Sequence, residues 1–400
     1  MSSRRILVAA FGDAGHAFPA LSLGVALSDR GHDVVLESWE HWREAAEAHG
    51  LRFRAAEEYQ TFPPPKPGVG PGPAEAARAL AALFADFDPE LVVADILTPA
   101  PALAAELHGC RSATLVPHVY PVADRGMPLF SLGAMPPRSG IGRAGWRLGA
   151  PLLEAGLRRG RRELNETRTS LGLPPTERLH GGISEDLVLV ATLPELEYPR
   201  SWPSEVQVCG PLGFELAHPD VELPSGREPL ILIAPSTAQD PEGRLIRSCF
   251  EALSAEPVRI VAATNGQRPT RAIEAPDNAR LYEWLSYSQL MPLADLVICH
   301  GGHGTTCRAL GAGLPMLISP ALGDMAENAA RVQWVGAGLT LPSRLRTRHS
   351  IRWLVRELLG QTRYRRRAAE IAAGNPPQRG PEQAVAAVER LLEVPSGPRR

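Results

Sequence analysis

The chain has 400 residues, of which 44% are apolar and 22% are charged, and its formal net charge is −2. These values are typical of a soluble globular protein with two domains of ordinary size. The near-neutral charge argues against nucleic acid as a partner.

The cysteines and the N-terminus indicate where the protein acts. Five scattered cysteines show no metal-ligand spacing and are typical of thiols in a reducing compartment. The N-terminus runs directly into a short apolar strand, without the longer apolar stretch of a signal peptide. No segment approaches the roughly 20 apolar residues that span a bilayer. We therefore expect a cytoplasmic protein with no integral membrane segment and no bound metal.

The first half of the chain alternates apolar strands with helices. Strands are predicted at 6–10, 33–38, 91–94, 112–117 and 206–211, and helices at 18–30 and 74–87. Pro19 is expected in the first turn of the first helix. This order predicts a parallel sheet covered by helices on both faces.

Two stretches of the first half lack a regular pattern. Residues 59–73 are rich in Pro and Gly, and residues 118–150 mix apolar, aromatic and polar side chains. Both lie near predicted strand ends, where α/β proteins bind ligands. We expect them to line an acceptor pocket, with His118 on that side. Residues 214–229, with three prolines and four acids, are predicted to be a linker.

The second half repeats the alternation. Strands are predicted at 230–236, 258–264, 296–299 and 315–319, and helices at 242–253, 350–373 and 381–392. The sequence therefore predicts an α/β protein with two doubly wound domains that face each other across a cleft.

A glycine-rich turn, residues 300–304, follows the strand at 296–299. It leads into a helix predicted to begin near Thr305, so its backbone N–H groups and the helix dipole would attract a phosphate. His300 could add a donor. The next strand ends before Pro320, and Asp324 follows in a polar loop. An anion site beside an acidic acceptor is what a nucleotide-diphosphate sugar requires.

These residues also carry a resemblance to a known family. The run His300-Gly-Gly-x-Gly-Thr, then Gly-x-Pro, then Pro-x-x-x-Asp-x-x-x-Asn resembles the donor-binding stretch of family-1 glycosyltransferases. That family includes bacterial natural-product glycosyltransferases and UDP-glycosyltransferases. The resemblance implies the GT-B fold of two Rossmann-like domains around a central cleft. It implies an acceptor domain at 1–213, a donor domain at 230–378, and a helix at 379–400 that crosses back to the first domain.

The first strand leads to a candidate general base. His16 is predicted to lie in the turn just before the first helix, where the helix dipole would favour its neutral form. Asp95 ends the strand at 91–94 and could orient the imidazole. The structural alternatives are that His16 only caps a helix and that Asp95 only begins a turn. In the resemblance, Gly15-His16-Ala17-Phe18-Pro19 and Asp95 match the family's catalytic positions.

The resemblance also implies a set of donor-binding residues. In this sequence they are Trp284 for base stacking with Leu285 beside it, His300, Gly302, Gly304 and Thr305 for the diphosphate, and Asp324 with Met325 for the sugar. Ser236 and Thr237 are candidates for further phosphate contacts, or for helix capping. The family often has Gln where Met325 stands. It often has a ribose-binding Glu where Arg308 stands, and the absence of that Glu weakens the case for UDP and leaves dTDP open.

Together these features predict an inverting, metal-independent glycosyltransferase of the hexosyltransferase type. It would move a sugar from a dTDP- or UDP-sugar, with no other cofactor, to a hydroxyl of a hydrophobic acceptor such as a natural-product aglycone in antibiotic biosynthesis. A monomer or a homodimer is expected. The alternatives are a lipid-acceptor glycosyltransferase and a catalytically silent helper protein. A nicotinamide dehydrogenase is disfavoured, because no G-x-G-x-x-G follows the first strand.

Overall fold

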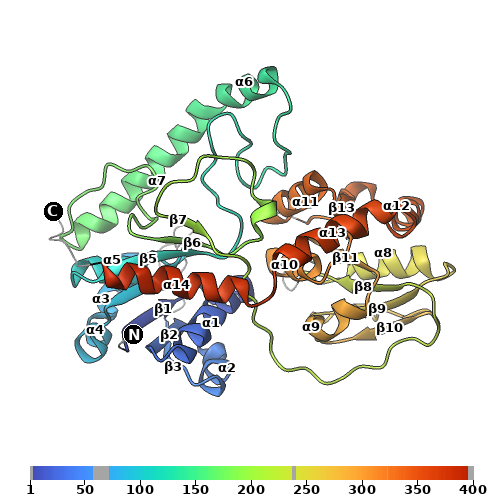
Figure 1. Ribbon diagram of the computed structural model, residues 1–400, viewed down its shortest axis with the longest axis horizontal. Helices are drawn as coiled ribbons and strands as arrows, with labels where there is room; N and C mark the ends of the chain where they lie inside the picture. Colours follow the sequence, from blue (N-terminus) through green and yellow to red (C-terminus); the bar gives the residue numbers. More distant parts are fainter. Residues whose placement is uncertain (1–2, 57–71, 237–239, 322, 395–400) are drawn as a thin grey trace.

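The computed structural model describes residues 3–56, 72–236, 240–321 and 323–394. In this part of the chain two parallel sheets lie side by side, each covered by helices (Figure 1). The predicted architecture of two doubly wound sheets is confirmed. Of the predicted acceptor segment at 59–73, residues 59–71 lie outside the described residues. Thr237 lies outside them as well.

The first sheet has the strand order β3-β2-β1-β4-β5-β6-β7. Its strands are β1 Arg5–Ala9, β2 Asp33–Ser38, β3 Arg52–Ala55, β4 Leu91–Asp95, β5 Arg111–Val116, β6 Val188–Val190 and β7 Val206–Val208. Helices α1 (Ala14–Asp29) and α14 (Arg379–Glu393) pack on one face, and α3 (Pro73–Ala79), α4 (Ala81–Phe87) and α5 (Pro99–Leu107) pack on the other. Burial on both faces explains the continuous apolar strands.

The second sheet has the order β10-β9-β8-β11-β12-β13. Its strands are β8 Leu230–Ala234, β9 Arg259–Ala263, β10 Ala279–Tyr282, β11 Leu296–Cys299, β12 Met316–Ile318 and β13 Gly338–Thr340. Helices α8 (Arg244–Leu253) and α12 (Arg348–Gly360) cover one face, and α10 (His303–Gly311), α11 (Asp324–Val335) and α13 (Thr362–Gly374) cover the other. The strand order reverses between β1 and β4 and between β8 and β11, which is where such folds bind ligands.

The remaining elements are short or lie outside these layers. They are α2 Arg43–Ala48, α6 Gly140–Leu148, α7 Ala150–Ser170 and α9 Tyr287–Leu290, with the 3₁₀ turns η1 Glu40–Trp42, η2 Pro194–Leu196, η3 Met291–Leu293 and η4 Ser343–Leu345. The predicted linker contains no helix or strand.

Several predicted elements differ from the structure. The helix at 74–87 is two helices separated at Leu80, and the helix at 350–373 is two helices separated at Gln361. The prediction that 118–150 is irregular is wrong for α6 and the start of α7, since glycines disguise the helical pattern there. Strands β3, β6, β10 and β13 were not predicted, because three or four residues carry little periodic signal.

Two helices at the cleft begin earlier than predicted. Helix α1 begins at Ala14, not Phe18, because the Asp13 side chain accepts the Gly15 N–H at 3.1 Å and caps the helix. His16 is therefore within the first turn of the helix, and Pro19 is inside the helix rather than in its first turn. Helix α10 begins at His303 rather than Thr305.

A buried arginine connects the two halves. Arg331 of α11 is 5% exposed and donates to Glu327 at 2.9 Å and to Glu197, which follows η2, at 3.2 Å. The guanidinium also donates to the Leu196 carbonyl oxygen and lies 4.0 Å from the centre of the Tyr198 ring. The guanidinium thus has several partners, which a buried charge requires, whereas Glu327 pairs only with Arg331 among the described residues.

The C-terminal helix α14 returns to the first sheet and packs on α1 (Figure 1). Arg30 of α1 donates to Glu389 of α14 at 3.1 Å. At the start of α14, Gly380 lies so close to the chain that a Cβ there would clash with the Pro211 carbonyl oxygen. The domain boundaries at 213, 230 and 378 stay predictions.

This close approach predicts the effect of one added methyl group. Gly380→Ala should lower the free energy of unfolding by about 1–3 kcal/mol, because the rigid backbone of 210–211 must move. Thermal unfolding followed by circular dichroism measures the change. Gly156→Ala in α7 is the matched control: no atom of the described residues lies within 4 Å of the new Cβ, so this change should be neutral or slightly stabilising. Equal midpoints for Gly380→Ala and wild type would contradict the prediction.

Candidate active site

The ends of β1 and β4 bring His16 and Asp95 together. The two strands are parallel neighbours, with Ala9 opposite Ala94, so the residues that follow them meet at one edge of the sheet. His16 Nδ1 lies 2.8 Å from Asp95 Oδ2, and Asp95 Oδ1 accepts the Leu97 N–H at 2.8 Å. With Nδ1 donating to the carboxylate, Nε2 carries the lone pair that can accept a proton.

The pKa of His16 corrects one expectation. Burial disfavours the imidazolium, but the carboxylates of Asp95, Asp13 and Asp324 more than offset burial, so the pKa of His16 is raised above its ordinary value. The expectation that the helix dipole favours the neutral form is wrong in direction, because a hydrogen-bonded carboxylate outweighs a partial charge. The raised pKa makes His16 a stronger base.

Aromatic rings surround His16. Phe11 and His118 meet it edge-on, with ring centres 5.9 Å and 6.3 Å away, and His118 stacks on Phe130 at 5.0 Å. His118 Nδ1 is 2.7 Å from the Val119 carbonyl oxygen, to which it donates. Burial lowers the pKa of His118 to about 3, so the ring is neutral at any working pH. The place predicted for His118, on the acceptor side, stays a prediction.

The glycine-rich turn has the form of an anion site. Gly302 caps α10 without a side-chain hydrogen bond, so the first amides of the helix remain for a ligand. No atom of the described residues lies within 4 Å of a Cβ built on Gly302 or Gly304, which leaves open space there. Gly301 has φ of +87° and lies against Ile318 and the Met325 carbonyl, so only glycine fits.

His300 lies behind this turn. It is 3% exposed; its Nδ1 accepts the Ser236 N–H at 2.9 Å, and its Nε2 is 3.5 Å from Asp240 Oδ2. Burial lowers the pKa of His300, so the ring is neutral. Any hydrogen bond from His300 to an anion would therefore come from Nε2–H. The phosphate contacts predicted for His300, Ser236 and Thr305 stay predictions.

Asp324 is the first residue of α11 and faces the first half of the molecule. Burial raises the pKa of Asp324, although His303 and His16 partly offset it. The Asp324 carboxylate in turn raises the pKa of His16, so the two groups, one in each half, interact electrostatically. The roles predicted for Asp324 and Met325 in sugar binding stay predictions, but the structure brings Asp324 and the His16–Asp95 pair to one site.

Sequence reasoning missed His303 as a site residue. Its Nδ1 lies 3.1 Å from Asn328 Oδ1 and its Nε2 lies 3.3 Å from Cys307 Sγ. Asn328 also donates to the Gly301 carbonyl oxygen at 2.8 Å, so this group holds the glycine turn against α11. The spacing of His303 and Cys307 could have indicated their contact, because residues four apart lie on one face of a helix.

Trp284 is 45% exposed, so it is not a core residue. Its indole lies parallel to the ring of His218 in the linker, with ring centres 5.8 Å apart and planes 4° apart. Leu285 is 3% exposed and belongs to the core, so any ligand contact of Leu285 would come from its backbone. Base stacking on Trp284 stays a prediction.

Arg308 anchors the linker to the second sheet. It donates to Glu215 at 3.0 Å and to the Phe214 carbonyl oxygen. Glu215 also accepts the Tyr287 N–H at 2.8 Å, so the linker is bound at this end to the start of α9. Near the middle of the linker, the Tyr282 hydroxyl donates to the Glu222 carbonyl oxygen at 2.6 Å.

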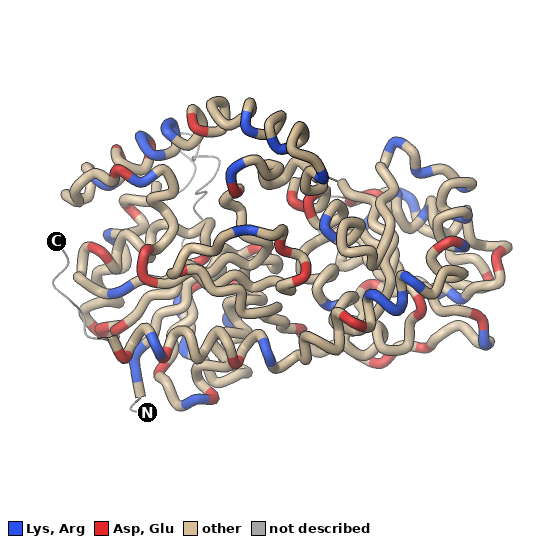
Figure 2. Tube along the Cα trace, turned by 45° about the horizontal axis from the view of Figure 1, so that its top comes forward, with Lys and Arg blue, Asp and Glu red and all other residues tan. Residues whose placement is uncertain are grey.

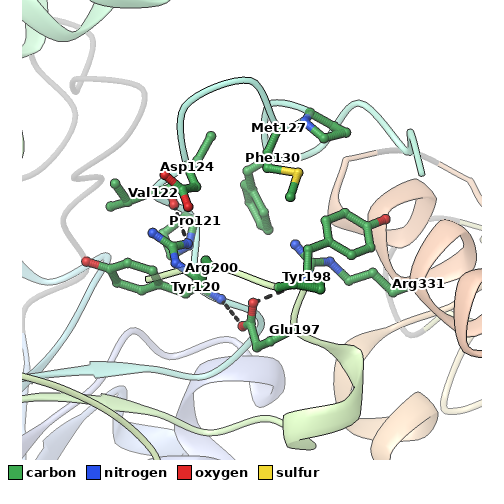
Figure 3. A pocket seen from close by; sticks show the side chains of 13 residues that line it. Tyr120, Pro121, Val122, Asp124, Met127, Phe130, Glu197, Tyr198, Arg200 and Arg331 are labelled. Atoms are coloured by element: carbon green, nitrogen blue, oxygen red, sulfur yellow. Dashed lines mark hydrogen bonds and ion pairs between the residues drawn. The ribbon is translucent and has the colours of Figure 1, made fainter. Parts of the chain in front are cut away.

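A small hollow lies near the joint between the halves, between residues 120–130 and 197–200 (Figure 3). It is closed by the Arg200 guanidinium over the Tyr120 ring and by Glu197, which accepts the Tyr120 N–H at 2.6 Å. Its volume of about 20 Å³ has room for roughly one water, so it is not a substrate pocket.

Among the described residues, no group of three or more His, Cys, Asp and Glu side chains could hold a metal ion. Nor is any helix in the described ranges long and apolar enough to cross a membrane.

The chain is similar in sequence to known proteins. Residues 248–391 match the family model described as Erythromycin biosynthesis protein CIII-like, C-terminal domain. Over 405 residues the chain is 30% identical to 4'-demethylrebeccamycin synthase of Lentzea aerocolonigenes, covering 92% of this chain and 94% of that protein.

Solved structures share the fold. The glycosyltransferase of kitacinnamycin matches with a TM-score of 0.77 at 20% identity, covering 97% of this chain and 99% of that chain. The glycosyltransferase VinC in complex with dTDP matches with a TM-score of 0.71 at 20% identity, with the same coverage. The predicted GT-B fold is therefore confirmed.

The His16–Asp95 contact predicts how His16 titrates. Asp95→Asn removes the charge that raises the pKa most, so the pKa of His16 should fall. The acid limb of any rate that needs neutral His16 should then move to lower pH, because the neutral form persists further down. NMR titration of the His16 ring measures this directly. Asp29→Asn, at the far end of α1, is the control; an unchanged or higher pKa in Asp95→Asn would contradict the prediction.

Proposed function

This chain belongs to the glycosyltransferases of bacterial natural-product and antibiotic biosynthesis, and from that premise we propose that it is an inverting, metal-independent enzyme. It moves a sugar from a nucleoside-diphosphate donor to a hydroxyl of a hydrophobic small molecule. The observation that carries the proposal is the 2.8 Å contact of His16 with Asp95, opposite the glycine turn and Asp324.

The transfer is a single displacement. The acceptor hydroxyl hydrogen-bonds to His16 Nε2, which takes its proton as the oxygen attacks the anomeric carbon of the sugar. Asp95 stabilises the imidazolium that forms, because its carboxylate already accepts from Nδ1. One attack from the side opposite the leaving group inverts the configuration at that carbon.

The nucleoside diphosphate leaves onto the start of α10. The amides at Gly302–Thr305 and the positive end of the helix dipole meet the charge that develops on the leaving phosphate, with His300 Nε2–H as a further donor. These fixed dipoles supply the stabilisation that a metal ion supplies in other transferases. Asp324 accepts hydrogen bonds from the sugar hydroxyls.

The donor nucleotide is dTDP or UDP, with dTDP favoured. Arg308 stands where the family often has a ribose-binding Glu. Its guanidinium pairs with Glu215 instead. The dTDP bound in the VinC structure supports the same choice. In this proposal Trp284 stacks on the base, and its exposed indole suits that role.

The acceptor is apolar and aromatic. Phe11, His118 and Phe130 form an aromatic wall around His16, and Trp39 packs edge-on against Phe11 at 5.1 Å. Flat aromatic scaffolds pack well on such rings. The acceptor half is the domain at 1–213 and the donor half the domain at 230–378. The cytoplasmic location and the oligomeric state stay predictions from the sequence.

Removal of the base tests the mechanism. His16→Ala should lower kcat roughly 10²- to 10⁴-fold while the Kd for dTDP or UDP stays unchanged, since the donor site lies on the other half. Calorimetry with each nucleotide and a turnover assay with apolar aromatic alcohols measure the two quantities. His349→Ala, exposed on α12, is the control. Near-normal kcat in His16→Ala would remove His16 from the mechanism. Nucleotide binding without transfer to any acceptor would favour a catalytically silent helper protein.

The stacking partners of Trp284 give a second test. Trp284→Ala should weaken dTDP or UDP binding about tenfold or more, because base stacking contributes roughly 1–3 kcal/mol. His218→Ala should instead strengthen binding, because the His218 ring lies parallel to the indole that the base would use. Calorimetry measures both. Trp353→Ala is the matched control, since Trp353 is 61% exposed on α12. Unchanged affinity in Trp284→Ala would disprove the stacking role.

A further inference from the structure

His303 is the first residue of α10 and stands at the variable position of the glycine-turn motif. The resemblance therefore assigns it no role, and the reaction proposed above does not use it. Its ring has a partner on each nitrogen: Nδ1 lies 3.1 Å from Asn328 Oδ1, and Nε2 lies 3.3 Å from Cys307 Sγ. Asn328 and Cys307 are both buried, so water does not compete for either contact.

The direction of the hydrogen bond between His303 and Asn328 follows from the contacts of the amide. The Asn328 amide nitrogen donates to the Gly301 carbonyl oxygen at 2.8 Å, and the amide oxygen faces the imidazole. An amide oxygen only accepts, so Nδ1 of His303 carries the hydrogen. The protonated ring also carries a hydrogen on Nδ1, so this bond is present whether the ring is neutral or charged.

This bond fixes the start of α10 against the start of α11. Asp324 and Asn328 are four residues apart on α11 and therefore lie on one face of it. His303 is thus fastened one helical turn away from Asp324. The glycine turn adds a second constraint, since a Cβ on Gly301 would lie only 3.0 Å from the Met325 carbonyl oxygen. The turn and the first turn of α11 are held in one arrangement.

Local geometry matters at this place because charge is not concentrated there. Figure 2 shows acidic and basic residues interspersed over both halves of the trace, and the formal net charge is −2. Residues 300–307 contain no lysine or arginine. A diphosphate at the start of α10 would therefore be held mainly by aimed backbone amides, whose effect depends on their position.

We propose that His303 is a positioning residue for the nucleotide-sugar donor. Through Asn328 it sets the distance between the amides at the start of α10, which hold the diphosphate, and Asp324, which binds the sugar. This inference rests on the donor site of the proposed function. A nucleotide sugar spans both helices and needs the correct distance, whereas a free nucleoside diphosphate lies only at α10 and does not.

His303 also carries a charge, and its effect differs from that of position. Burial opposes protonation of the ring, but Cys307, Asn328 and Asp324 outweigh burial and raise the pKa of His303 to about 9. The charge acts on the phosphates that a nucleoside diphosphate and a nucleotide sugar share, so it strengthens the binding of both. Position acts on the nucleotide sugar alone.

Two substitutions of His303 separate these effects. His303→Leu removes the hydrogen bond and the charge. His303→Asn also removes the charge but places an amide N–H where Nδ1 stands. In His303→Leu the Kd of dTDP-glucose should rise about tenfold more than the Kd of dTDP, and kcat should fall roughly 10²-fold. In His303→Asn the two Kd values should change by the same factor. Calorimetry measures the Kd values, with UDP-glucose and UDP in parallel.

Hydrogen exchange in the free protein gives a measurement that needs no ligand. The Thr306 N–H donates to the Gly302 carbonyl oxygen at 3.0 Å in the first turn of α10. Its exchange should be about tenfold faster in His303→Leu than in wild type, because that turn loses its contact with α11. In His303→Asn the exchange should match wild type.

His349 provides the matched control, since it is an exposed histidine in the first turn of α12. His349→Leu and His349→Asn should leave every measured quantity unchanged, and circular dichroism confirms that each variant is folded. Equal changes in the two Kd values of His303→Leu, equal losses in His303→Leu and His303→Asn, or unchanged exchange of the Thr306 amide would each overturn this inference alone. A wild-type protein that binds neither dTDP nor UDP would overturn the proposed donor site, and this inference with it.

Discussion

The buried contacts of Arg331 hold the two halves of the molecule in register. Arg331 lies on α11, two turns after Asp324, and its partner Glu197 follows η2 of the first half. Burying a guanidinium is costly, and this one is compensated by Glu327, Glu197 and the Leu196 carbonyl oxygen. Because Asp324 and Arg331 share one helix, the same contact determines how the second half faces His16.

Within the cleft, the acidic groups make His16 a base. Burial by itself would make the imidazole harder to protonate. The Asp95 hydrogen bond, with Asp13 and Asp324 nearby, reverses that effect. His118, one ring away, has no such carboxylate, and burial leaves it with a low pKa. Two neighbouring histidines therefore have opposite electrostatic character, and only one is suited to accept a proton.

His16 and Asp95 were predictable from the sequence, whereas His303 and His218 were not. His16 and Asp95 follow apolar strands, and parallel strands end at a common edge, so their proximity could be expected. The glycine turn was predictable from its own sequence motif, His300-Gly-Gly-x-Gly-Thr. His303 stood at a variable position of that motif, and His218 lay in a linker without pattern. Their contacts with Asn328 and Trp284 join segments far apart in the chain, which local periodicity does not encode.

The sequence by itself determined the two alternating halves, the glycine turn and the two residues of the His16–Asp95 pair, because each depends on a local pattern of apolar, glycine and polar residues. The tertiary structure alone decided the sign of the His16 pKa shift, the start of α1 at Ala14, the linker contact over Trp284 and the exposure of Ile141, Leu148 and Leu152. Those properties depend on burial and on the distance between charges, and both arise only when remote segments pack together.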